Sequence, residues 1–578
     1  MTTTTETDVA VDRSTARPAQ AGGPGEVGSA PAEGGSAAAA FVRWGLAAYL
    51  GAVVLVVGGI LVYLRGHFGY VLDDAAIHLS IADHLAHDGT WGVTAGSFES
   101  ASSSPLWTVL VAVGALAGPG VRDWTPLLLN VAAGVGVVVL LGRHQAVLRP
   151  DRRRLLDLVA TAVLVVVVLF LPGLAVVGME HTLHVLLVLA AVILVHRREE
   201  GRADRLPTGA PYALVALATL SRFETAFVAV GLAAGVLVAG GGAVGGWAGV
   251  RDGIRDAAAR RRAVGLVAAS AVPIAAFGVV NRALGGGWLP NSVLAKGQGT
   301  DADGDGLGVI DIANRLTQDP LVAALFAVAV VYLAVTWGRP AAARLPGVTL
   351  VVATAGHVVL ADVGWYERYQ AYLIAVGVYV GLTVLAELPA EAARRALVAA
   401  VGLCLVLGAT KANGLVRAPR AADDMYRHHY QAARFLDRYY DEASVATDQL
   451  GYISLYHDGP LTDLAGLGDY EVLRAGPPDP EEWEELARRR GVRVVVLFDY
   501  SVAGRAPDSW IVAGQLRLDG RDTTSVSRTL QFLATSPDEL HPLQDRLAEF
   551  AADLPPRVEL QINEYADLQV FARELRSG

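Results

Sequence analysis

The sequence predicts a polytopic α-helical membrane protein with about eleven transmembrane helices, followed by a C-terminal extracytoplasmic α/β domain. Hydrophobic residues make up 53% of the 578 residues and charged residues only 18%, whereas soluble domains carry roughly 25% charged residues. The deficit lies in long apolar runs before residue 410, which excludes a soluble enzyme. The single cysteine, Cys404, excludes an intrachain disulfide.

Charge is distributed unevenly along the chain. Residues 410–578 contain 28 Asp and Glu against 19 Lys and Arg, so they account for −9 of the formal net charge of −10. A water-exposed acidic domain is therefore expected there, and nucleic acid is excluded as a partner because it requires a basic surface. Short β-branched runs alternate with helical patterns in this part of the chain, which predicts an α/β domain.

The N-terminal segment 1–40 is rich in Thr, Ala, Gly, Ser and Pro and has no aromatic residue. Such a composition cannot bury enough surface to offset the entropy of ordering, so a disordered tail is expected. The run 41–64 that follows is long enough to span a bilayer. No signal-peptide pattern precedes it, which favours an uncleaved signal anchor.

The transmembrane domain is expected over 41–409. After the first span, apolar runs occur at 105–118, 126–142, 155–177, 182–195, 210–221, 223–239, 263–281, 320–337, 346–361, 371–386 and 396–409. Alternate connections are rich in Lys and Arg, and the positive-inside rule places these in the cytoplasm together with the N-terminus. Because successive spans must alternate between the two sides of the membrane, 105–118, only 14 residues long, must then be re-entrant. A spanning 105–118 with one basic loop outside stays open as an alternative.

The first outer loop, 65–104, contains the adjacent carboxylates Asp73 and Asp74 before a helical pattern. One of them could cap that helix by accepting hydrogen bonds from its first-turn amides. The second is then free for other chemistry, because two close carboxylates split their proton affinities and one can act as a base near neutral pH. From the local sequence alone, helix capping and solvation is the simpler interpretation.

The short outer loops hold ionisable residues at membrane depth. Such groups are costly unless they are paired or face a polar cavity, so they are functional-site candidates. Mutual salt bridges that fix helix packing, such as Arg222 with Glu224, are the alternative. The residues concerned are Glu180 and His181 in GMEHT, Arg222 and Glu224 in SRFET, and Glu367 and Arg368 in GWYERYQ.

Two further segments hold candidate residues. In the long outer loop 282–319, the acidic run at 301–305 matches the start of a calcium-binding loop, but Ile312 replaces the final Glu, so a simple acidic loop is favoured. Lys296 in the same loop could meet a phosphate or a lipid headgroup. The segment 448–469, which begins with Asp448, suits either a loop over a site or ordinary turns. The chain has no P-loop, dinucleotide fingerprint, zinc-ligand spacing or nucleophile elbow.

Taken in order, these motifs resemble the GT-C class of integral-membrane glycosyltransferases. The branch it most resembles contains the actinobacterial terminal β-(1→2) arabinofuranosyltransferases that act on arabinogalactan and lipoarabinomannan. Ala75 and Ala76 stand where relatives usually have an aromatic residue, and SRFET stands where Arg-Pro-Glu is common. The motifs between Phe41 and Asp469 are LDDAAIHLSIADHLAHDGTW, SSSPLW, GMEHTLHVLL, LSRFETA, LPNSVLAKG, ERYQAYLI and DQLGYISLYHDGPLTDLAGLGD.

The resemblance implies a multi-pass cell-membrane enzyme that moves a sugar from a polyprenyl-phosphate donor to a cell-wall or lipoglycan acceptor. The branch that the chain most resembles implies arabinofuranose as that sugar. The expected mechanism is a single displacement with inversion, in which Asp73 or Asp74 is the catalytic base. The candidate phosphate-binding cations are Arg368, Lys296 and Arg222. The candidate substrate-binding residues are His78, Glu180, His181, Glu224, Glu367 and Asp448.

This scheme needs no cofactor and no metal, although the two carboxylates could hold a divalent cation. Transfer of mannose or another hexose from a polyprenyl phosphate is the alternative within the same class. A lipid or sugar transporter, or flippase, is the alternative of another class, and the lack of an internal repeat argues against it. A non-enzymatic sensor would not need eleven spans.

Overall fold

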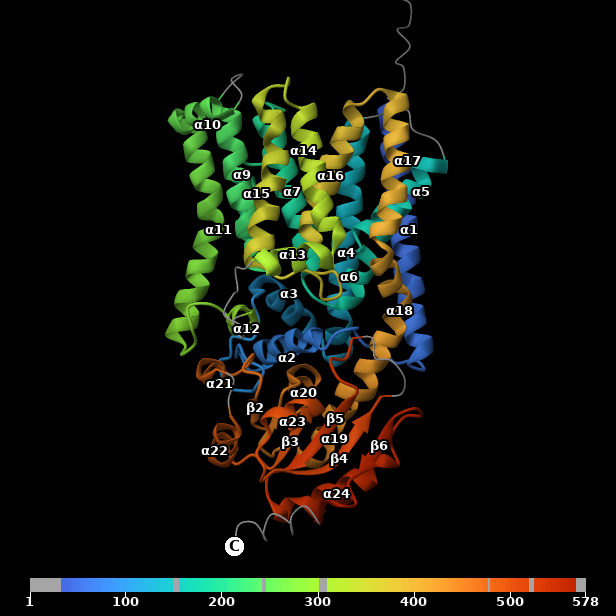
Figure 1. Cartoon of the computed structure of the whole chain (residues 1–578), viewed down its shortest axis with the longest axis vertical. Helices are drawn as coiled ribbons and strands as arrows, with labels where there is room; N and C mark the ends of the chain where they lie inside the picture. Colours follow the sequence, from blue (N-terminus) through green and yellow to red (C-terminus); the bar gives the residue numbers. More distant parts are fainter. Residues whose placement is uncertain are drawn as a thin grey trace, which may run out of the picture.

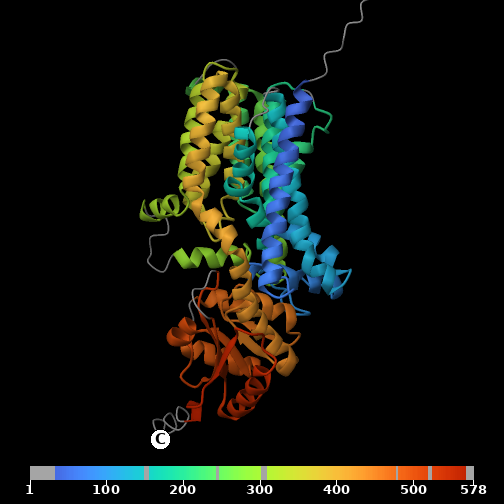
Figure 2. The same cartoon turned by 90° about the vertical axis from the view of Figure 1, so that its right-hand side faces the viewer.

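The computed structural model describes residues 33–148, 155–202, 204–241, 246–300, 309–476, 479–518 and 524–567. It shows a long helical bundle with a sheet-containing domain stacked on one end (Figure 1). The side view shows the same two parts in line along the longest axis (Figure 2). The expected tail 1–40 falls mostly outside the described residues, and helix α1 (Glu33–Tyr63) already includes its last eight positions.

The bundle is built from apolar helices that run along its long axis. They are α1, α4 (Pro119–Leu148), α5 (Leu155–Val163), η1 (Leu164–Val168), α6 (Leu171–Val177), α7 (His181–Glu199), α8 (Ala210–Ser221), α9 (Thr225–Gly240), α11 (Ala257–Ala283), α14 (Pro320–Val335), α15 (Leu345–Leu360), α16 (Ala371–Glu387) and α17 (Ala390–Leu407). The short 3-10 helix η2 (Ala341–Arg344) leads into α15.

Within the described residues, six helices are long and apolar enough to cross a membrane, or up to eight if each of two bent helix pairs forms one span. The shorter apolar helices α8, α9 and α16 bring the count to the predicted eleven if each of them also crosses. The fourth short apolar helix, α3 (Pro105–Ala115), has 11 residues. It lies outside the bundle, beside the helix over 74–87 in the layer between the bundle and the sheet domain (Figure 1). The predicted polytopic helical fold is confirmed.

The two ends of the bundle differ in what they carry. The basic helix α10 (Gly246–Arg255) and the start of α17 lie at the end away from the sheet domain (Figure 1). At the same end, the Asp256 carboxylate caps α11 by accepting hydrogen bonds from the amides of Ala258 and Ala259, at 3.0 Å each. The opposite end, which faces the sheet domain, is called here the domain-side end.

A thin layer of short helices separates the bundle from the sheet domain. Helices α2 (Asp74–His87) and α3 lie side by side there, with α12 (Asn291–Thr300) beside them (Figure 1). Helix α13 (Val309–Gln318) meets α14 at 97°. The Asp319 side chain caps α14 by accepting from the amide of Leu321 at 3.0 Å, and Pro320 occupies the first turn, where no amide hydrogen is needed.

The chain enters the C-terminal domain on a helix. Helix α18 (Ala409–Met425) follows α17 after a bend of 51°, and it continues through η3 (Tyr426–Tyr430) into α19 (Gln431–Tyr440). The predicted boundary at 409/410 lies one residue into α18, and this helix packs against α1.

The C-terminal domain contains one six-stranded sheet in the order β2-β1-β3-β5-β4-β6. Strands β2, β1 and β3 are parallel, and the remaining neighbours pair antiparallel. The strands are β1 (Val445–Thr447), β2 (Leu461–Asp463), β3 (Val494–Phe498), β4 (Ile511–Arg517), β5 (Thr529–Ala534) and β6 (Glu559–Ile562). The helices between them are α20 (Leu450–Tyr456), α21 (Tyr470–Ala475), α22 (Pro480–Arg490), α23 (Asp499–Arg505) and α24 (Pro537–Ala551).

Helices cover both faces of this sheet. Alternate residues of β3 enter two separate cores, since successive side chains of a strand point to opposite faces. Val494, Val496 and Phe498 pack with α19 and α24, whereas Val495 and Leu497 pack with α22. The predicted α/β domain is confirmed, and the continuous apolar run of β3 follows from its burial on both faces.

Candidate active site

Asp73 connects the first outer loop to the C-terminal domain. Its Oδ2 accepts a hydrogen bond from the amide of Gly451 at 2.8 Å, and its Oδ1 accepts one from the amide of Tyr452 at 2.9 Å. These amides belong to the first turn of α20, so Asp73 caps α20. Asp73, one of the two residues considered as a cap for α2, makes no side-chain cap on that helix, because its carboxylate accepts the amides of α20 instead.

Gly451 allows this close approach. A Cβ atom at residue 451 would lie 2.3 Å from the backbone oxygen of Asp73 and 2.4 Å from its Cγ. Burial raises the pKa of Asp73, while nearby His429 and the two amides act in the opposite direction. His429 lies on η3, and its Nε2 is 3.0 Å from Oε1 of Gln449.

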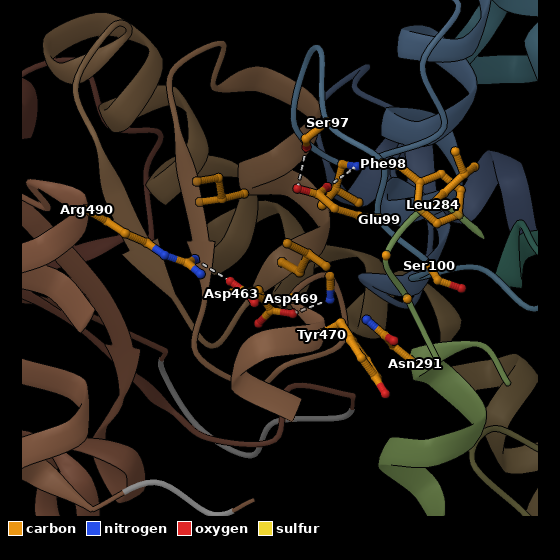
Figure 3. Close-up of a pocket in the computed structure, with 16 residues that line it drawn as sticks. Ser97, Phe98, Glu99, Ser100, Leu284, Asn291, Asp463, Asp469, Tyr470 and Arg490 are labelled. Carbon is orange, nitrogen blue, oxygen red and sulfur yellow. Dashed lines mark hydrogen bonds and ion pairs between the residues drawn. The ribbon is translucent and has the colours of Figure 1, made fainter. Parts of the chain in front are cut away.

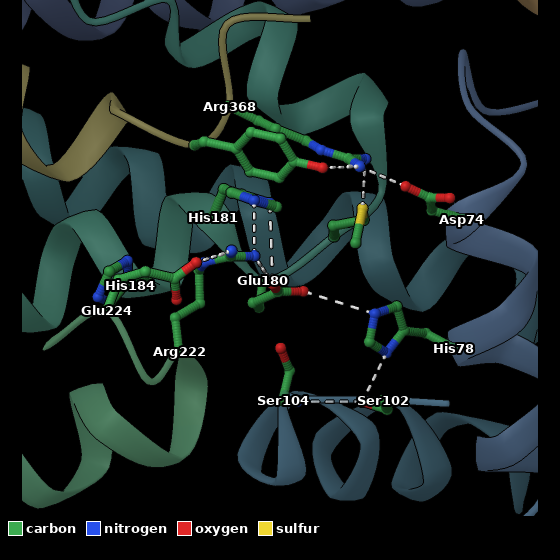
Figure 4. Close-up of polar contacts among 12 residues, drawn as sticks. Asp74, His78, Ser102, Ser104, Glu180, His181, His184, Arg222, Glu224 and Arg368 are labelled. Atoms are coloured by element: carbon green, nitrogen blue, oxygen red, sulfur yellow. Dashed lines mark hydrogen bonds and ion pairs between the residues drawn. The ribbon is translucent and has the colours of Figure 1, made fainter. Parts of the chain in front are cut away.

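Asp74 points toward the bundle instead. It forms an ion pair with the buried guanidinium of Arg368 (Figure 4). Arg368 follows three consecutive non-glycine residues with positive φ, which are Trp365, Tyr366 and Glu367 at 43°, 59° and 62°. Such strain costs roughly 1–3 kcal/mol per residue and occurs where the surroundings fix the backbone, often at functional sites.

Further contacts hold the Arg368 guanidinium. Nη2 donates to the Tyr369 hydroxyl at 3.2 Å, Nη1 lies 2.8 Å from Sδ of Met179, and the guanidinium lies 5.0 Å from the centre of the Tyr369 ring. Tyr369 and Met179 belong to the motifs ERYQ and GMEH, but neither was predicted as a site residue. Asp74 and Arg368, predicted separately as site residues, thus lie together, and Met179 from another loop contacts the same guanidinium.

A second cluster is centred on Arg222 at the same end of the bundle (Figure 4). Its Nη1 donates to Oε1 of Glu180 at 2.6 Å and lies 2.9 Å from Nε2 of His181, and its Nη2 donates to Glu224. The salt-bridge alternative for Arg222 and Glu224 is confirmed. His78 reaches this cluster from α2, with its Nε2 3.7 Å from Oε2 of Glu180.

His78 and the GMEH turn have identifiable supports. Burial lowers the pKa of His78, so this ring is neutral near pH 7, and its Nδ1 lies 3.4 Å from Oγ of Ser102. Gly178 begins the turn at φ 74°, where a Cβ would lie 2.4 Å from the Tyr70 ring. Only glycine therefore fits both the left-handed backbone and the ring packed against it.

The remaining sequence-predicted residues lie elsewhere. Glu367 belongs to a separate buried cluster, in which Nζ of Lys411 lies 3.7 Å from Glu367 Oε2 and 3.5 Å from Asp319 Oδ2. Gln370 donates to both carboxylates, at 3.0 and 2.8 Å. Lys296 is part of α12, but its side chain is outside the described residues, as is the acidic run 301–305.

A cavity of about 140 Å³ lies between α2 and the sheet domain. Its walls come from the start of α2, the α15–α16 loop, the α18–η3 helix and the segments after β1 and β2. Asp448 follows β1 and Asp463 ends β2, so both lie at the carboxyl edge of parallel strands, where open α/β sheets usually bind ligands. The lining residues are Leu72, Asp73, Asp74, Ile77, Trp365, Met425, His429, Asp448, Gln449, Leu450, Asp463, Ala465, Leu467, Thr524 and Val526.

The two carboxylates of the sheet edge have unusual acidities. Burial raises the pKa of Asp448 to about 6, although its carboxylate accepts a hydrogen bond from the Ser501 hydroxyl at 2.6 Å. Burial raises the pKa of Asp463 to about 7, although it accepts from the amides of Gly468 and Ala465 at 2.6 and 2.9 Å. Asp463 was not predicted as a site residue, because the sequence marks it only as one of several Asp residues in the segment 448–469.

The described residues contain no group of three or more His, Cys, Asp or Glu side chains arranged to hold a metal ion. Asp73 and Asp74, the pair expected to be able to hold a cation, turn their carboxylates toward α20 and Arg368 respectively. Each carboxylate is thus engaged by protein groups, although both residues line the same cavity.

Comparisons with known proteins give one partial family match. The model of a domain of unknown function (DUF8728) matches residues 420–532, which lie in the C-terminal part of the chain. A search of curated proteins finds no match to this chain.

Several solved structures resemble the whole chain weakly. The archaeal oligosaccharyltransferase AglB from Archaeoglobus fulgidus, in complex with an inhibitory peptide and a dolichol-phosphate, is 12% identical over 89% of this chain and 75% of its own, with a TM-score of 0.45. ArnT from Cupriavidus metallidurans in the apo state is 12% identical over 85% of this chain and 98% of its own, with a TM-score of 0.49. The same ArnT bound to undecaprenyl phosphate gives a TM-score of 0.40 at 12% identity and the same coverage. Likeness at this level says nothing about substrates or catalytic residues.

Proposed function

We propose that the protein is a GT-C glycosyltransferase that moves a sugar from a polyprenyl phosphate to a glycan acceptor at the outer face of the cell membrane. One observation carries the proposal: Asp73 lies on a cavity at the domain-side end of an apolar helical bundle, next to the ion pair of Asp74 and Arg368. The sugar phosphate of a lipid-linked donor lies at the membrane surface, so the base and the cation that act on it must lie at the end of the bundle. The order of the sequence motifs supports the same class.

We assign the role of catalytic base to Asp73. A carboxylate has about four lone-pair sites, and the two amides of α20 fix its orientation while leaving sites for the acceptor hydroxyl. The raised pKa suits a base that works near neutral pH. Asp74 is less suited, because its carboxylate is engaged by the guanidinium of Arg368.

The proposed reaction is a single displacement. The acceptor hydroxyl transfers its proton to Asp73 as its oxygen forms a bond to the anomeric carbon of the donor sugar. The bond from that carbon to the phosphate oxygen breaks on the opposite face, so the polyprenyl phosphate leaves and the configuration inverts. General-base assistance of this kind contributes about 10²–10⁴ in rate.

We assign stabilisation of the phosphate to Arg368. Asp74, which lines the cavity, orients the Arg368 guanidinium, and a positive charge there would stabilise the negative charge that develops on the leaving phosphate. Arg222 already lies between the carboxylates of Glu180 and Glu224, and we assign it to holding the GMEH turn together with His78 and His181. Lys296 stays a second candidate for the phosphate.

The finer points of the proposal concern the sugar and the orientation. Arabinofuranose is proposed as the transferred sugar on the motif resemblance, with mannose or another hexose as the alternative. Asp448, on the cavity wall, is proposed to contact the sugar. The N-terminus is proposed to be cytoplasmic and the C-terminal domain extracytoplasmic, because the basic connections favour the cytoplasm. Protease added to intact cells should cut the C-terminal domain, and complete protection would reverse the orientation.

The enzymatic proposal is tested by transfer of radiolabelled sugar from synthetic polyprenyl-phosphate arabinose or mannose to a glycan acceptor in membranes. Wild type should transfer label from one donor, and Asp73→Asn should lose about 10²–10⁴ of the rate. Asp88→Asn, an exposed carboxylate at the other end of α2, is the matched control and should keep full activity. Transfer at the wild-type rate by Asp73→Asn would rule out its role, and transfer from the mannosyl donor alone would overturn the choice of arabinose.

A further inference from the structure

A second cavity of about 270 Å³ lies between the first outer loop and the sheet domain (Figure 3). Leu450 and Asp463 line both cavities, so the second adjoins the proposed catalytic one. Its other walls come from the end of the first outer loop at 97–100, the α11–α12 turn at 284–291, and the sheet domain around 468–470. Three chain segments that are far apart in the sequence therefore meet around it.

Two buried polar side chains face this cavity without using their hydrogen-bonding groups. Asn291 is 1% exposed and Ser100 is 3% exposed. Among the described residues, neither the amide oxygen and nitrogen of Asn291 nor Oγ of Ser100 has a hydrogen-bond partner. The backbone amide of Asn291 donates to the carbonyl of Ser100 at 3.0 Å, which brings the two residues together at the cavity wall. Buried groups left unpaired cost about 1–3 kcal/mol each, and a ligand in the cavity would satisfy them.

The charges on the cavity wall are matched within the protein. Glu99 accepts from the amides of Val93 and Thr94 at 2.7 and 3.0 Å and from the Ser97 hydroxyl at 2.6 Å. Arg490, the only cation among the lining residues, is paired with Asp469. An anionic ligand would meet carboxylates without a free cation, and a cation would meet carboxylates whose oxygens already accept hydrogen bonds.

The groups that remain suit a neutral ligand rich in hydroxyl groups. The Asn291 amide offers two donors and an acceptor, and the Ser100 hydroxyl offers one donor and an acceptor, a set that matches neighbouring hydroxyls of a sugar ring. Tyr470 adds an aromatic side chain to the wall (Figure 3). The volume is close to the lower end of the roughly 300–1,000 Å³ of ligand pockets, which suits a small unit of a glycan.

We infer that this second cavity binds a sugar residue of the acceptor glycan through Asn291 and Ser100, next to the residue whose hydroxyl reacts at Asp73. The inference rests on the proposed function, since it names the site at which that reaction would take its acceptor.

The test compares purified full-length wild type with Asn291→Ala and Ser100→Ala. Binding of a synthetic tri-arabinofuranoside, with a mannotrioside in a second arm, is measured by saturation-transfer NMR in detergent. Acceptor KM, donor KM and donor hydrolysis to water are measured in membranes. Asn130→Ala is the matched control, because Asn130 is also buried with both side-chain atoms unpaired but lies in the middle of α4.

Both cavity variants should raise the acceptor KM about 3- to 10-fold, the loss expected for one or two uncharged hydrogen bonds, and should weaken binding of one trisaccharide. Donor KM and donor hydrolysis should stay unchanged, as should all values for Asn130→Ala. Leu284→Trp, at the exposed rim, should raise the acceptor KM without touching a buried group.

Two kinds of failure are distinguishable. An unchanged acceptor KM in Asn291→Ala and Leu284→Trp, with active transfer, would overturn the acceptor site alone. No transfer and no donor hydrolysis by wild type from any polyprenyl-phosphate sugar would overturn the proposed function. Trisaccharide binding that persists unchanged in Asn291→Ala would also overturn the site, whatever the activity.

Discussion

Asp73→Asn exchanges one carboxylate oxygen for an amino group while keeping the shape of the side chain. In the wild type, each oxygen accepts one backbone amide of α20. Asparagine has a single acceptor oxygen, so one of the two backbone N–H groups of α20 must face the NH2 of the asparagine side chain. Two separate losses follow: the base disappears, and the contact between α2 and α20 weakens.

The two losses have different sizes and different readouts. Removal of the base should lower kcat by about 10²–10⁴. An amide without an acceptor should cost about 1–3 kcal/mol of the free energy of unfolding, which appears as a lower Tm of the detergent-solubilised protein. Gly451→Ala attacks the same contact from the other side, since its Cβ would lie 2.4 Å from Cγ of Asp73, but it keeps the carboxylate.

The assay is therefore a double-mutant cycle measured by kcat and by Tm. Gly451→Ala should lower Tm by an amount similar to Asp73→Asn and should lower kcat less. The Tm losses should not add in the double variant, because both changes break one contact. Asp74→Asn should reduce kcat at least tenfold less than Asp73→Asn. If Asp73→Asn keeps more than a tenth of the wild-type kcat, or if Asp74→Asn loses as much as Asp73→Asn, the division of roles between the two residues is wrong.

Three further predictions concern the surroundings of the site. The pKa of Asp448 is raised to about 6 in the folded protein, so the native state binds more protons than the unfolded state between about pH 4 and pH 6. The free energy of unfolding should therefore fall as pH rises through this window. Asp448→Asn should flatten this fall, measured by urea or thermal unfolding at a series of pH values. Gly178→Ala should lower Tm and activity together, by roughly 1–3 kcal/mol in stability, since its Cβ would meet the Tyr70 ring at 2.4 Å; an unchanged Tm would show that the turn adapts freely. Arg368→Gln should raise the donor KM more than the acceptor KM in steady-state kinetics, and the opposite order would remove Arg368 from the phosphate site.

Much of the architecture could be predicted because it depends on local composition. The apolar spans, the short α3 and the α/β character of the last third all follow from the length and spacing of apolar runs. The ionisable residues of the short loops were also recognisable, since charge at membrane depth is rare. That these residues gather at one end of the bundle could be predicted as well, because successive spans cross the membrane in alternating directions.

The partners within the site could not be predicted in the same way. The amides that hold Asp73 come 378 and 379 residues later in the chain, and no local pattern encodes a pairing over that distance. Glu367 and Arg368 are adjacent in sequence, yet one joins Lys411 and the other joins Asp74. Asn291 could not be predicted as a binding residue, because the sequence does not show that this asparagine is buried with its side-chain amide unpaired.

The position of α2 explains how two identical neighbouring residues can have different roles. This helix lies between the bundle and the sheet domain (Figure 1), and its residues three or four apart share a face. Asp74 and His78 lie on the face toward the bundle, where they meet Arg368 and Glu180. Asp73 reaches α20 on the opposite side.

The rest of that opposite face belongs to the sheet domain as well. Ile77 and Ile81 pack with Leu450, and the Ser80 hydroxyl donates to the carbonyl of Ser454 at 2.9 Å. The proposed base, held by amides of the C-terminal domain, and Arg368, the proposed phosphate-binding cation held in the bundle, are thus joined by one short helix. It follows that the distance between base and phosphate depends on how the domain docks onto α2, so changes at the α2–α20 contact should alter kcat even where no reacting group is touched.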